Sequence, residues 1–280
     1  MLEHQEILAR IRSLPPAPAI LARVLSIMDD PKAGAQELIA AIEVDPGVTA
    51  NVLRTCNSPY YAGSRQICTL EEAVHRVGMR TVSQLATTNG AETLLNGTHE
   101  GYGLAPGDLW HHSISVAIGS RLLAKKVGFA RAEVAYTGGL LHDVGKIVLD
   151  VVLRRRYGEV REEVEQGATF QEAEQGVLGI EHAELGARIA ESWGFPAPLL
   201  AAIRHHHDPE SAGEEVDLCS LVHLADALAH WLGVGLGRPG LAVRFESSAV
   251  RHFGLRPDDL DRVMIELVER MEETEQSLAA

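Results

Sequence analysis

Apolar residues recur at helical spacing along this chain. Ile20, Leu21, Val24, Leu25 and Met28 fall at i, i+1, i+4, i+5 and i+8, which places them on one face of a helix. The same period returns in one segment after another. Nowhere do β-branched residues alternate with polar ones over the length of a strand. The sequence therefore predicts an all-α fold.

Proline, glycine and short polar side chains mark the ends of these segments. Asp45 before Pro46 offers a side-chain acceptor at a helix cap and a proline at the first turn, and Thr69 followed by Glu72 has the spacing of a capping box. The expected helices cover approximately residues 3–12, 20–28, 35–44, 46–57, 69–77, 80–95, 108–127, 130–142, 146–156, 159–166, 169–176, 181–193, 196–206, 216–232 and 258–273.

Chain length and one loop-like stretch predict two lobes. A chain of 280 residues with 46% hydrophobic residues lies in the size range where a single core begins to divide. The stretch from Asn96 to Gly107 is rich in glycine and polar residues and is the best candidate for a boundary. We expect a helical lobe at residues 1–100 and a second helical lobe with a C-terminal helical tail at residues 101–280.

Charge and cysteine content exclude several classes of protein. The net charge is -14, and Arg154–Arg156 is the longest basic run, which argues against binding to nucleic acid or to an anionic membrane. Cys56, Cys68 and Cys219 form no Cys-x-x-Cys pair and suit a reducing compartment. No apolar window approaches the roughly 18 residues of a membrane span. We expect a soluble, cytoplasmic protein.

The segment GGLLHDVGKIVL, residues 138–149, carries the strongest chemical signal. His142, Asp143 and Lys146 place an imidazole, a carboxylate and an ammonium group within two helical turns, where a metal ion and a phosphate could both be held. A lone His-Asp pair near a helix end is more often a cap or a solvated couple. Its meaning therefore depends on partners elsewhere in the chain.

Candidate partners are numerous in the second lobe, where nine histidines lie between residues 111 and 230. His112 lies near the start of one expected helix, His182 opens another, and His206 and His207 close a third. Asp226 lies inside an apolar helix, where a buried carboxylate is costly unless a positive or hydrogen-bonding group meets it. A metal ion would meet that requirement.

The order of these residues resembles the HD superfamily of metal-dependent phosphohydrolases. The motifs are LWHHSISVA around His112, GLLHDVGK around His142 and Asp143, EHAELGARIAESWGFP around His182, AAIRHHHDP around His206 and His207, and LVHLADALA around Asp226. With LPPAPAILARVLSIMDDP, VDPGVTANVLRTCNSPYYAG and TLEEAVHRVGMRTVSQLA in the first half, residues 13–235 resemble an HDOD-domain protein. The resemblance implies an N-terminal helical lobe packed on an HD-type helical lobe.

The resemblance also implies a set of ligands. One site would use His112, His142, Asp143 and Asp226, and a second would use His182, His206 and His207 with Asp143 bridging. His111 and His205 are alternatives one residue out of register. Imidazole and carboxylate ligands suit one or two ions of Fe, Mn, Zn, Co or Ni.

Asp143 and Lys146 are the catalytic candidates. Asp143 would lie between two ions, and Lys146 would neutralise charge that develops on a phosphoryl group, unless it is simply a solvated lysine. Asp108, four residues before His112, is a helix cap or an extra ligand. His223, one turn before Asp226, is a core or surface residue or else a hydrogen-bond partner of a ligand.

The resemblance supports two main hypotheses for function. In the first, the chain is a bacterial-type signal-transduction regulator whose metal is structural or vestigial, with protein partners in signalling or a small phosphorylated ligand. In the second, it is an active phosphohydrolase or phosphodiesterase on a nucleotide or other phosphoester. Many HDOD domains lack several ligands and are regarded as non-catalytic, whereas all seven positions are present here. The ordered motifs disfavour a third hypothesis, a purely structural protein with incidental histidines.

Two features bear on substrate and assembly. The HD-GYP phosphodiesterases that act on cyclic di-GMP continue their histidine pair into Gly-Tyr-Pro, whereas here the pair runs into DPESAG, residues 208–213, which argues against cyclic di-GMP hydrolysis. The last expected helix has an apolar side with Val263, Ile265 and Leu267. This side packs on its own lobe or contacts a second subunit.

Overall fold

The structure, a computed structural model, describes residues 19–61, 66–234 and 247–279. These residues form helices, with one isolated backbone bridge between His99 and Leu104. No strand occurs among them, and the predicted all-α fold is confirmed. Within the same ranges, no helix combines the length and the apolar character needed to cross a bilayer. The helix expected at residues 3–12 lies outside the described residues.

The helices pack into two units. The first, the histidine unit, contains Leu95–Ser192 and Ala197–Leu267. The second, the N-terminal unit, contains the described residues up to Leu94, the short segment Trp193–Pro196 and the part of the last helix that follows Leu267. The candidate site lies entirely within the histidine unit.

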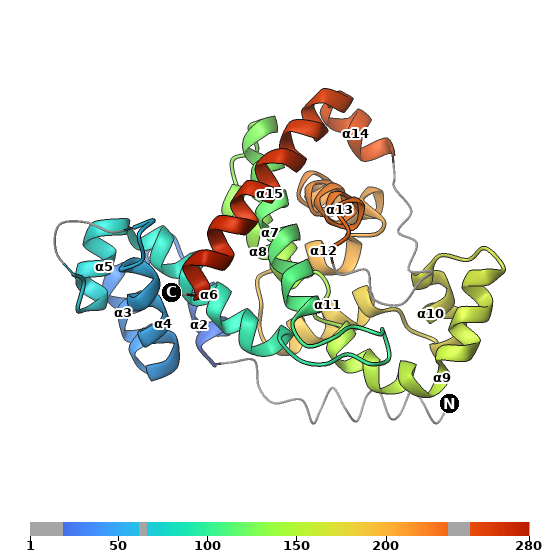
Figure 1. Ribbon diagram of the computed structural model, residues 1–280, viewed down its shortest axis with the longest axis horizontal. Helices are drawn as coiled ribbons and strands as arrows, with labels where there is room; N and C mark the ends of the chain where they lie inside the picture. Colours follow the sequence, from blue (N-terminus) through green and yellow to red (C-terminus); the bar gives the residue numbers. More distant parts are fainter. Residues whose placement is uncertain (1–18, 62–65, 235–246, 280) are drawn as a thin grey trace. The chain divides into compact units, whose positions relative to one another are not determined.

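The N-terminal unit is built from short amphipathic helices. Its core is aliphatic, and Leu38, Ile42 and Val52 are fully buried there. Asp45 begins one helix as predicted, because its Oδ1 accepts hydrogen bonds from two N–H groups of the first turn at 2.9 and 3.1 Å. The helices are α2 (Ala19–Asp29), α3 (Ala35–Glu43), α4 (Pro46–Cys56), α5 (Leu70–Val77) and α6 (Met79–Leu95) (Figure 1).

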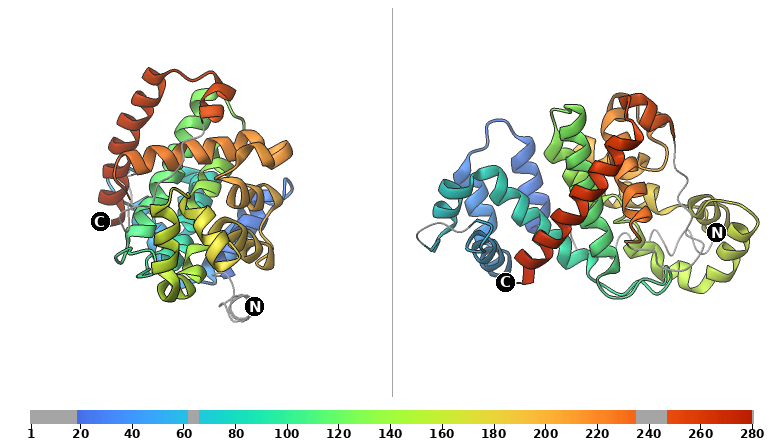
Figure 2. Two further views of the ribbon diagram at one scale, coloured as in Figure 1. Left: turned by 90° about the vertical axis from the view of Figure 1, so that its right-hand side faces the viewer. Right: turned by 45° about the horizontal axis from the view of Figure 1, so that its top comes forward.

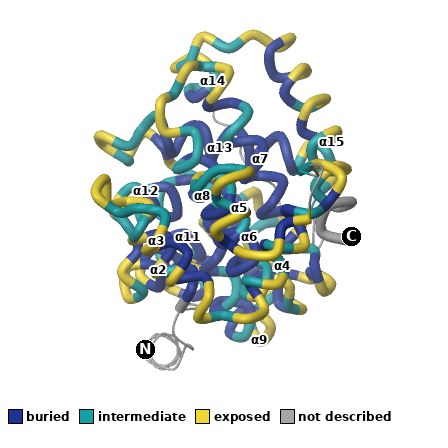
Figure 3. The backbone as a smooth tube through the Cα atoms, turned by 90° about the vertical axis from the view of Figure 1, so that its left-hand side faces the viewer, coloured by how far each residue is buried: buried dark blue, intermediate teal, exposed yellow. Residues whose placement is uncertain are grey.

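The histidine unit is organised around two helices that are buried over most of their length. These are α7 (Asp108–Val127) and α13 (Val216–Trp231), and Figure 3 shows both mostly buried. Val116 on α7 and Leu221 and Leu224 on α13 are fully buried in one core cluster. Helices buried to this extent must be covered by the other helices of the unit.

The other helices of the histidine unit surround this pair. They are α8 (Ala132–Leu141), α9 (Lys146–Glu165), α10 (Phe170–Leu178), α11 (His182–Ser192), α12 (Ala197–His205), the 3₁₀ helix η1 (Pro209–Glu215), α14 (Ser247–Phe253) and the first part of α15 (Pro257–Ala279). Helices α9 and α10 lie side by side (Figure 2).

The structure corrects the sequence prediction at three places. Helix α9 runs without a break where two helices, 146–156 and 159–166, were expected. Gly158 lies between the two expected segments, where it is exposed and a Cβ would meet no neighbouring segment within 4 Å. An exposed glycine inside a helix costs only about 1 kcal/mol, and the rest of α9 outweighs it. Helix α14 was not predicted, and α15 extends to Ala279 rather than to residue 273.

Candidate metal centre

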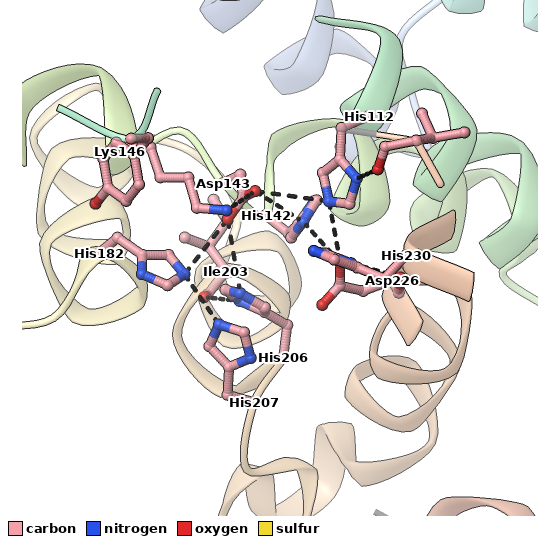
Figure 4. Close-up of polar contacts among 12 residues, drawn as sticks. His112, His142, Asp143, Lys146, His182, Ile203, His206, His207, Asp226 and His230 are labelled. Carbon is pink, nitrogen blue, oxygen red and sulfur yellow. Dashed lines mark hydrogen bonds and ion pairs between the residues drawn. The ribbon is translucent and has the colours of Figure 1, made fainter. Parts of the chain in front are cut away.

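Seven side chains converge inside the histidine unit from widely separated parts of the chain (Figure 4). They are the seven that the sequence singled out: His112 on α7, His142 and Asp143 in the turn between α8 and α9, His182 at the start of α11, His206 and His207 directly after α12, and Asp226 on α13. All except His207 are at most 3% exposed. His111, by contrast, is exposed, and neither it nor the half-buried His205 belongs to a group of converging donor atoms.

The donor atoms form two poles. In the α13 pole, which consists of His112, His142 and Asp226, the donor atoms lie within 4.8 Å of one another. The α12 pole consists of His182, His206 and His207 and meets the same limit. Each pole therefore has the size of a site for one metal ion.

Asp143 faces both poles with different oxygens. Its Oδ2 lies 3.4 Å from Nε2 of His142 and 3.7 Å from Nε2 of His112. Its Oδ1 lies 3.4 Å from Nε2 of His182 and 3.9 Å from Nε2 of His206. A carboxylate in this position can bridge two ions, one in each pole.

Hydrogen bonds to the main chain fix the orientation of three of the imidazoles. A carbonyl oxygen can only accept, so Nδ1 carries the proton and Nε2 presents its lone pair to the centre. The pairs are His112 with Val234 at 3.2 Å, His142 with Gly139 at 2.7 Å and His206 with Ile203 at 2.7 Å. Backbone geometry thus prepares these Nε2 atoms as ligands.

The inward-facing atoms lack hydrogen-bond partners in the part of the chain that the structure describes. They are Nε2 of His112, His142 and His206 and Oδ1 of Asp143 and Asp226. Leaving one buried polar group unsatisfied costs about 1–3 kcal/mol. In addition, Nε2 of His112 and Oδ1 of Asp226 are both acceptors and lie 3.0 Å apart. A cation between these atoms would remove the cost, so the residues fit a bound metal ion.

The protonation states of Asp143, His206 and His207 also suit a metal. Burial alone would raise the pKa of Asp143, but the nearby His142 and Lys146 outweigh it and hold this pKa well below its usual range. Burial lowers the pKa of His206 and of His207, and neighbouring imidazoles lower both further. The carboxylate is therefore ionised and these imidazoles are neutral at neutral pH, which are the forms that bind metals.

Gly145 brings two of the ligand-bearing segments together. A Cβ at this position would lie 1.9 Å from the carbonyl oxygen of His182 and 2.7 Å from the backbone nitrogen of Gly186. No side chain larger than hydrogen fits, so the start of α9 can approach the start of α11 only at a glycine. This contact sets His182 opposite Asp143.

Lys146 is not a solvated lysine. Its side chain is 14% exposed, and Nζ lies 2.5 Å from Oδ2 of Asp143. Burial lowers the pKa of Lys146, but the carboxylate of Asp143 outweighs this effect and raises it above its ordinary value. A positive charge therefore stays at the edge of the centre (Figure 4).

Three further residues support the seven. Glu174 on α10 is fully buried and accepts hydrogen bonds from His182. Nδ1 of His230 donates to the main-chain oxygen of Asp226 at 3.0 Å and lies 3.0 Å from Oδ1 of the same residue. Nδ1 of His223 donates to the carbonyl oxygen of His206 at 2.8 Å. The contact of His223 with a ligand's backbone was one of the two roles expected for it.

Only some of these supporting residues, and of the roles expected for Asp108, could have been predicted from the sequence. The i, i+4 spacing of Asp226 and His230 was a usable signal, whereas Glu174 lies in another helix and had only its place on the apolar side of α10. Asp108 is the first residue of α7 rather than its cap, which is Gly107. Its Oδ2 accepts a hydrogen bond from the backbone nitrogen of Ala105 at 2.7 Å, and it joins no metal group.

Comparison with protein families decides the classification. The family model of the HDOD domain matches residues 14–209, well over half of the chain. The chain belongs to the HDOD family. An HDOD-domain protein of unknown function from Geobacter sulfurreducens shares the fold with a TM-score of 0.76 and 26% identity, over 99% of this chain and 96% of that one.

Other similar proteins include two with functional names. A Shewanella amazonensis protein, provisionally classed as a phosphohydrolase, has a TM-score of 0.73 and 25% identity over 97% of both chains. A Treponema pallidum (strain Nichols) protein described as uncharacterized is 27% identical over 226 residues, which are 80% of this chain and 43% of that protein. Ribonuclease Y of Thermus thermophilus is 35% identical over 118 residues, 42% of this chain and 16% of the enzyme. The HDOD chain thus spans less than half the length of these curated relatives.

Proposed function

We propose that this HDOD protein holds two divalent transition-metal ions and hydrolyses a small phosphodiester. The observation that carries the proposal is the position of Asp143, whose two oxygens face two separate groups of converging donor atoms. Two-metal sites of this kind are typical of enzymes that cleave phosphoesters. The α13 pole would use His112, His142 and Asp226, and the α12 pole would use His182, His206 and His207.

Bound ions would supply Lewis acidity at the phosphoryl group. The chain's own residues would do the rest. Asp143 holds the two poles in register, and Lys146 places a fixed positive charge beside it, where negative charge on a phosphoryl oxygen would develop. The main-chain hydrogen bonds behind the imidazoles keep the ligands from reorganising during the reaction.

The choice of substrate rests on similarity and charge. Ribonuclease Y, which the chain resembles over 118 residues, is named for the cleavage of RNA, a phosphodiester. A net charge of -14 disfavours a polyanion such as RNA, because binding the phosphate backbone needs clustered lysine and arginine. A nucleotide phosphodiester with few charges suits the chain better, and the missing Gly-Tyr-Pro motif disfavours cyclic di-GMP.

A turnover assay tests this proposal. The protein would be purified without a histidine tag, loaded with Mn²⁺ or Fe²⁺, and given bis-p-nitrophenyl phosphate, cyclic nucleotides, cyclic dinucleotides and a short RNA. Metal-dependent turnover should fall by at least about 100-fold in Asp143→Asn and stay unchanged in Asp217→Asn, an exposed aspartate outside the metal groups. Cleavage of the RNA alone would overturn the proposed substrate class.

A regulatory role is the second candidate, and the burial of the site favours it. Six of the seven candidate ligands are at most 3% exposed, which leaves little room for a substrate to reach the ions. In that case the metal stabilises a module that binds a signalling partner. Full metal occupancy without turnover of any compound in the assay would select this role over the enzyme.

A further inference from the structure

We infer that Glu174 is the positioning residue of the α12 pole and that Tyr102 holds it in place. The inference rests on the proposed metal centre and adds to it two residues outside the ligand set. Its starting point is the environment of His182, which is the only α12-pole imidazole, among the described residues, with a carboxylate behind its ring.

Glu174 is fully buried, yet both of its oxygens are engaged. Oε2 accepts hydrogen bonds from Nδ1 of His182 at 2.6 Å and from the backbone nitrogen of the same residue at 2.9 Å. Oε1 accepts the phenolic hydrogen of Tyr102 at 2.5 Å. Burying a carboxylate is costly even when it accepts three hydrogen bonds. We therefore expect Glu174 to be kept because it holds other groups in position.

The bond to Nδ1 determines what His182 offers to an ion. A carboxylate accepts, so the proton sits on Nδ1 and Nε2 keeps its lone pair. Nε2 then points toward Nε2 of His207 at 2.9 Å and Oδ1 of Asp143 at 3.4 Å. Carboxylates behind metal-binding histidines fix the ring and raise the basicity of the ligand nitrogen.

Tyr102 is itself held by a close backbone contact. Gly101 donates a hydrogen bond from its nitrogen to Oδ1 of Asp150 on α9 at 2.7 Å. A Cβ on Gly101 would lie 2.4 Å from the carbonyl oxygen of Asp150, so only glycine allows this approach. Tyr102 is 0% exposed, and its ring packs against Phe170 with centroids 5.7 Å apart. The segment before α7 is thereby linked through Glu174 to the α12 pole.

Metal titration of matched variants tests the inference. Tag-free, metal-free protein would be titrated with Mn²⁺ by equilibrium dialysis and with Co²⁺ by visible absorption, for the wild type and Glu174→Gln. Glutamine keeps the shape and can still accept from His182, but it removes the charge. The wild type should bind two ions, and Glu174→Gln should weaken one of them by about 10- to 100-fold and leave the other unchanged.

Controls separate positioning from general loosening of the fold. Glu172→Gln makes the same substitution on the same helix, where it alters a capping hydrogen bond to Thr169, and should leave both affinities unchanged. His182→Ala should weaken the same ion as Glu174→Gln, whereas Asp226→Ala should weaken the other. Tyr102→Phe keeps the ring and removes only the hydroxyl group that donates to Glu174. It should weaken binding of the α12-pole ion several-fold, and it tests the inference even if Glu174→Gln does not fold.

Each remaining outcome is decisive. Unchanged affinities in Glu174→Gln, or equal weakening of both ions, would overturn the inference. A wild type that binds one ion, lost in Asp226→Ala and kept in His182→Ala, would also overturn it, because no ion would occupy the α12 pole. A wild type that binds no ion at all would instead end the proposed metal centre.

Discussion

At the scale of single residues, main-chain contacts fix the orientation of the candidate ligands and the spacing of the segments that carry them. Three imidazoles are oriented by main-chain carbonyls rather than by other side chains. Gly145 lets the segment that carries Asp143 approach the segment that carries His182. Glycine is needed there because of space rather than conformation, since its backbone is in the ordinary right-handed helical region.

Two glycine-to-alanine substitutions on either side of Lys146 should have opposite effects. Gly145→Ala should destabilise the protein and weaken metal binding, because the added methyl group would force α9 and α11 apart. Gly158→Ala, at an open position in α9, should stabilise it by about 0.5–1 kcal/mol. Urea denaturation measures both. Equal effects from the two changes would show that the close approach is not required.

The sequence predicted the seven candidate positions that the structure brings together, but it did not predict the residues behind them. All seven positions could be found because each belongs to a short motif in a fixed order. The choice of His112 over His111 needed the phase of α7 against its neighbours, which local periodicity does not supply. Glu174 escaped notice because nothing in α10 indicates that its buried face meets His182 of the next helix.

At the scale of helices, capping and helix-to-helix ion pairs determine where each element begins and what it packs against. Asp259, in the first turn of α15, accepts from the backbone nitrogen of Arg256 at 3.1 Å and pairs with Nζ of Lys126 on α7 at 2.8 Å. This residue both caps α15 and ties it to α7. Caps of this kind are readable from sequence, whereas the cross-helix partner is not.

Asp259 should make stability depend on pH. Hydrogen bonds from Lys126 and Arg256 hold the pKa of Asp259 well below its ordinary value. A depressed carboxyl pKa stabilises the fold above the unfolded value of about 4 and loses this effect as pH falls toward the folded value. Asp259→Asn should therefore be less stable than the wild type at pH 6, and the difference should shrink below about pH 4.

Chemical denaturation between pH 3 and pH 7 measures this difference. The matched control is Asp258→Asn, at the neighbouring position, whose carboxylate has no such pair among the described contacts. A wild-type advantage over Asp259→Asn that stays constant across the range would contradict the role given to the ionised carboxylate. If Asp258→Asn lost as much stability as Asp259→Asn, the effect would be a general property of the helix terminus rather than of the Asp259 ion pair.

At the scale of the whole molecule, the candidate metal ligands are confined to one of the two units. The histidine unit contains every candidate ligand, and the N-terminal unit contains none of them. The helical spacing of apolar residues and the residues that mark helix ends were enough to predict the all-α class and most helices. They could not show that Trp193–Pro196 and the end of α15 belong to the N-terminal unit, because no local pattern records such long-range packing.

Metal removal should therefore affect the two units unequally. An ion that binds only the folded state stabilises it by about 2.7 kcal/mol when its free concentration is 100 times its dissociation constant. Chelation should lower the unfolding temperature and increase hydrogen exchange in α7, α8, α12 and α13, with little change in α2–α5. Hydrogen-exchange mass spectrometry measures this pattern. The prediction would be contradicted if chelation increased hydrogen exchange equally in both units. It would also be contradicted if chelation had the same effect on Asp226→Ala as on the wild type.

The order of the candidate ligands along the chain has a consequence for biosynthesis. Every donor of the α12 pole, and Asp143 with them, has been synthesised once residue 207 is added, whereas the α13 pole lacks Asp226 until α13 is made. A nascent chain that ends between these positions can offer only one of the two poles in full. Under the proposed two-metal centre, an ion in the α13 pole would therefore be acquired late, after α13 has left the ribosome and packed beside α7.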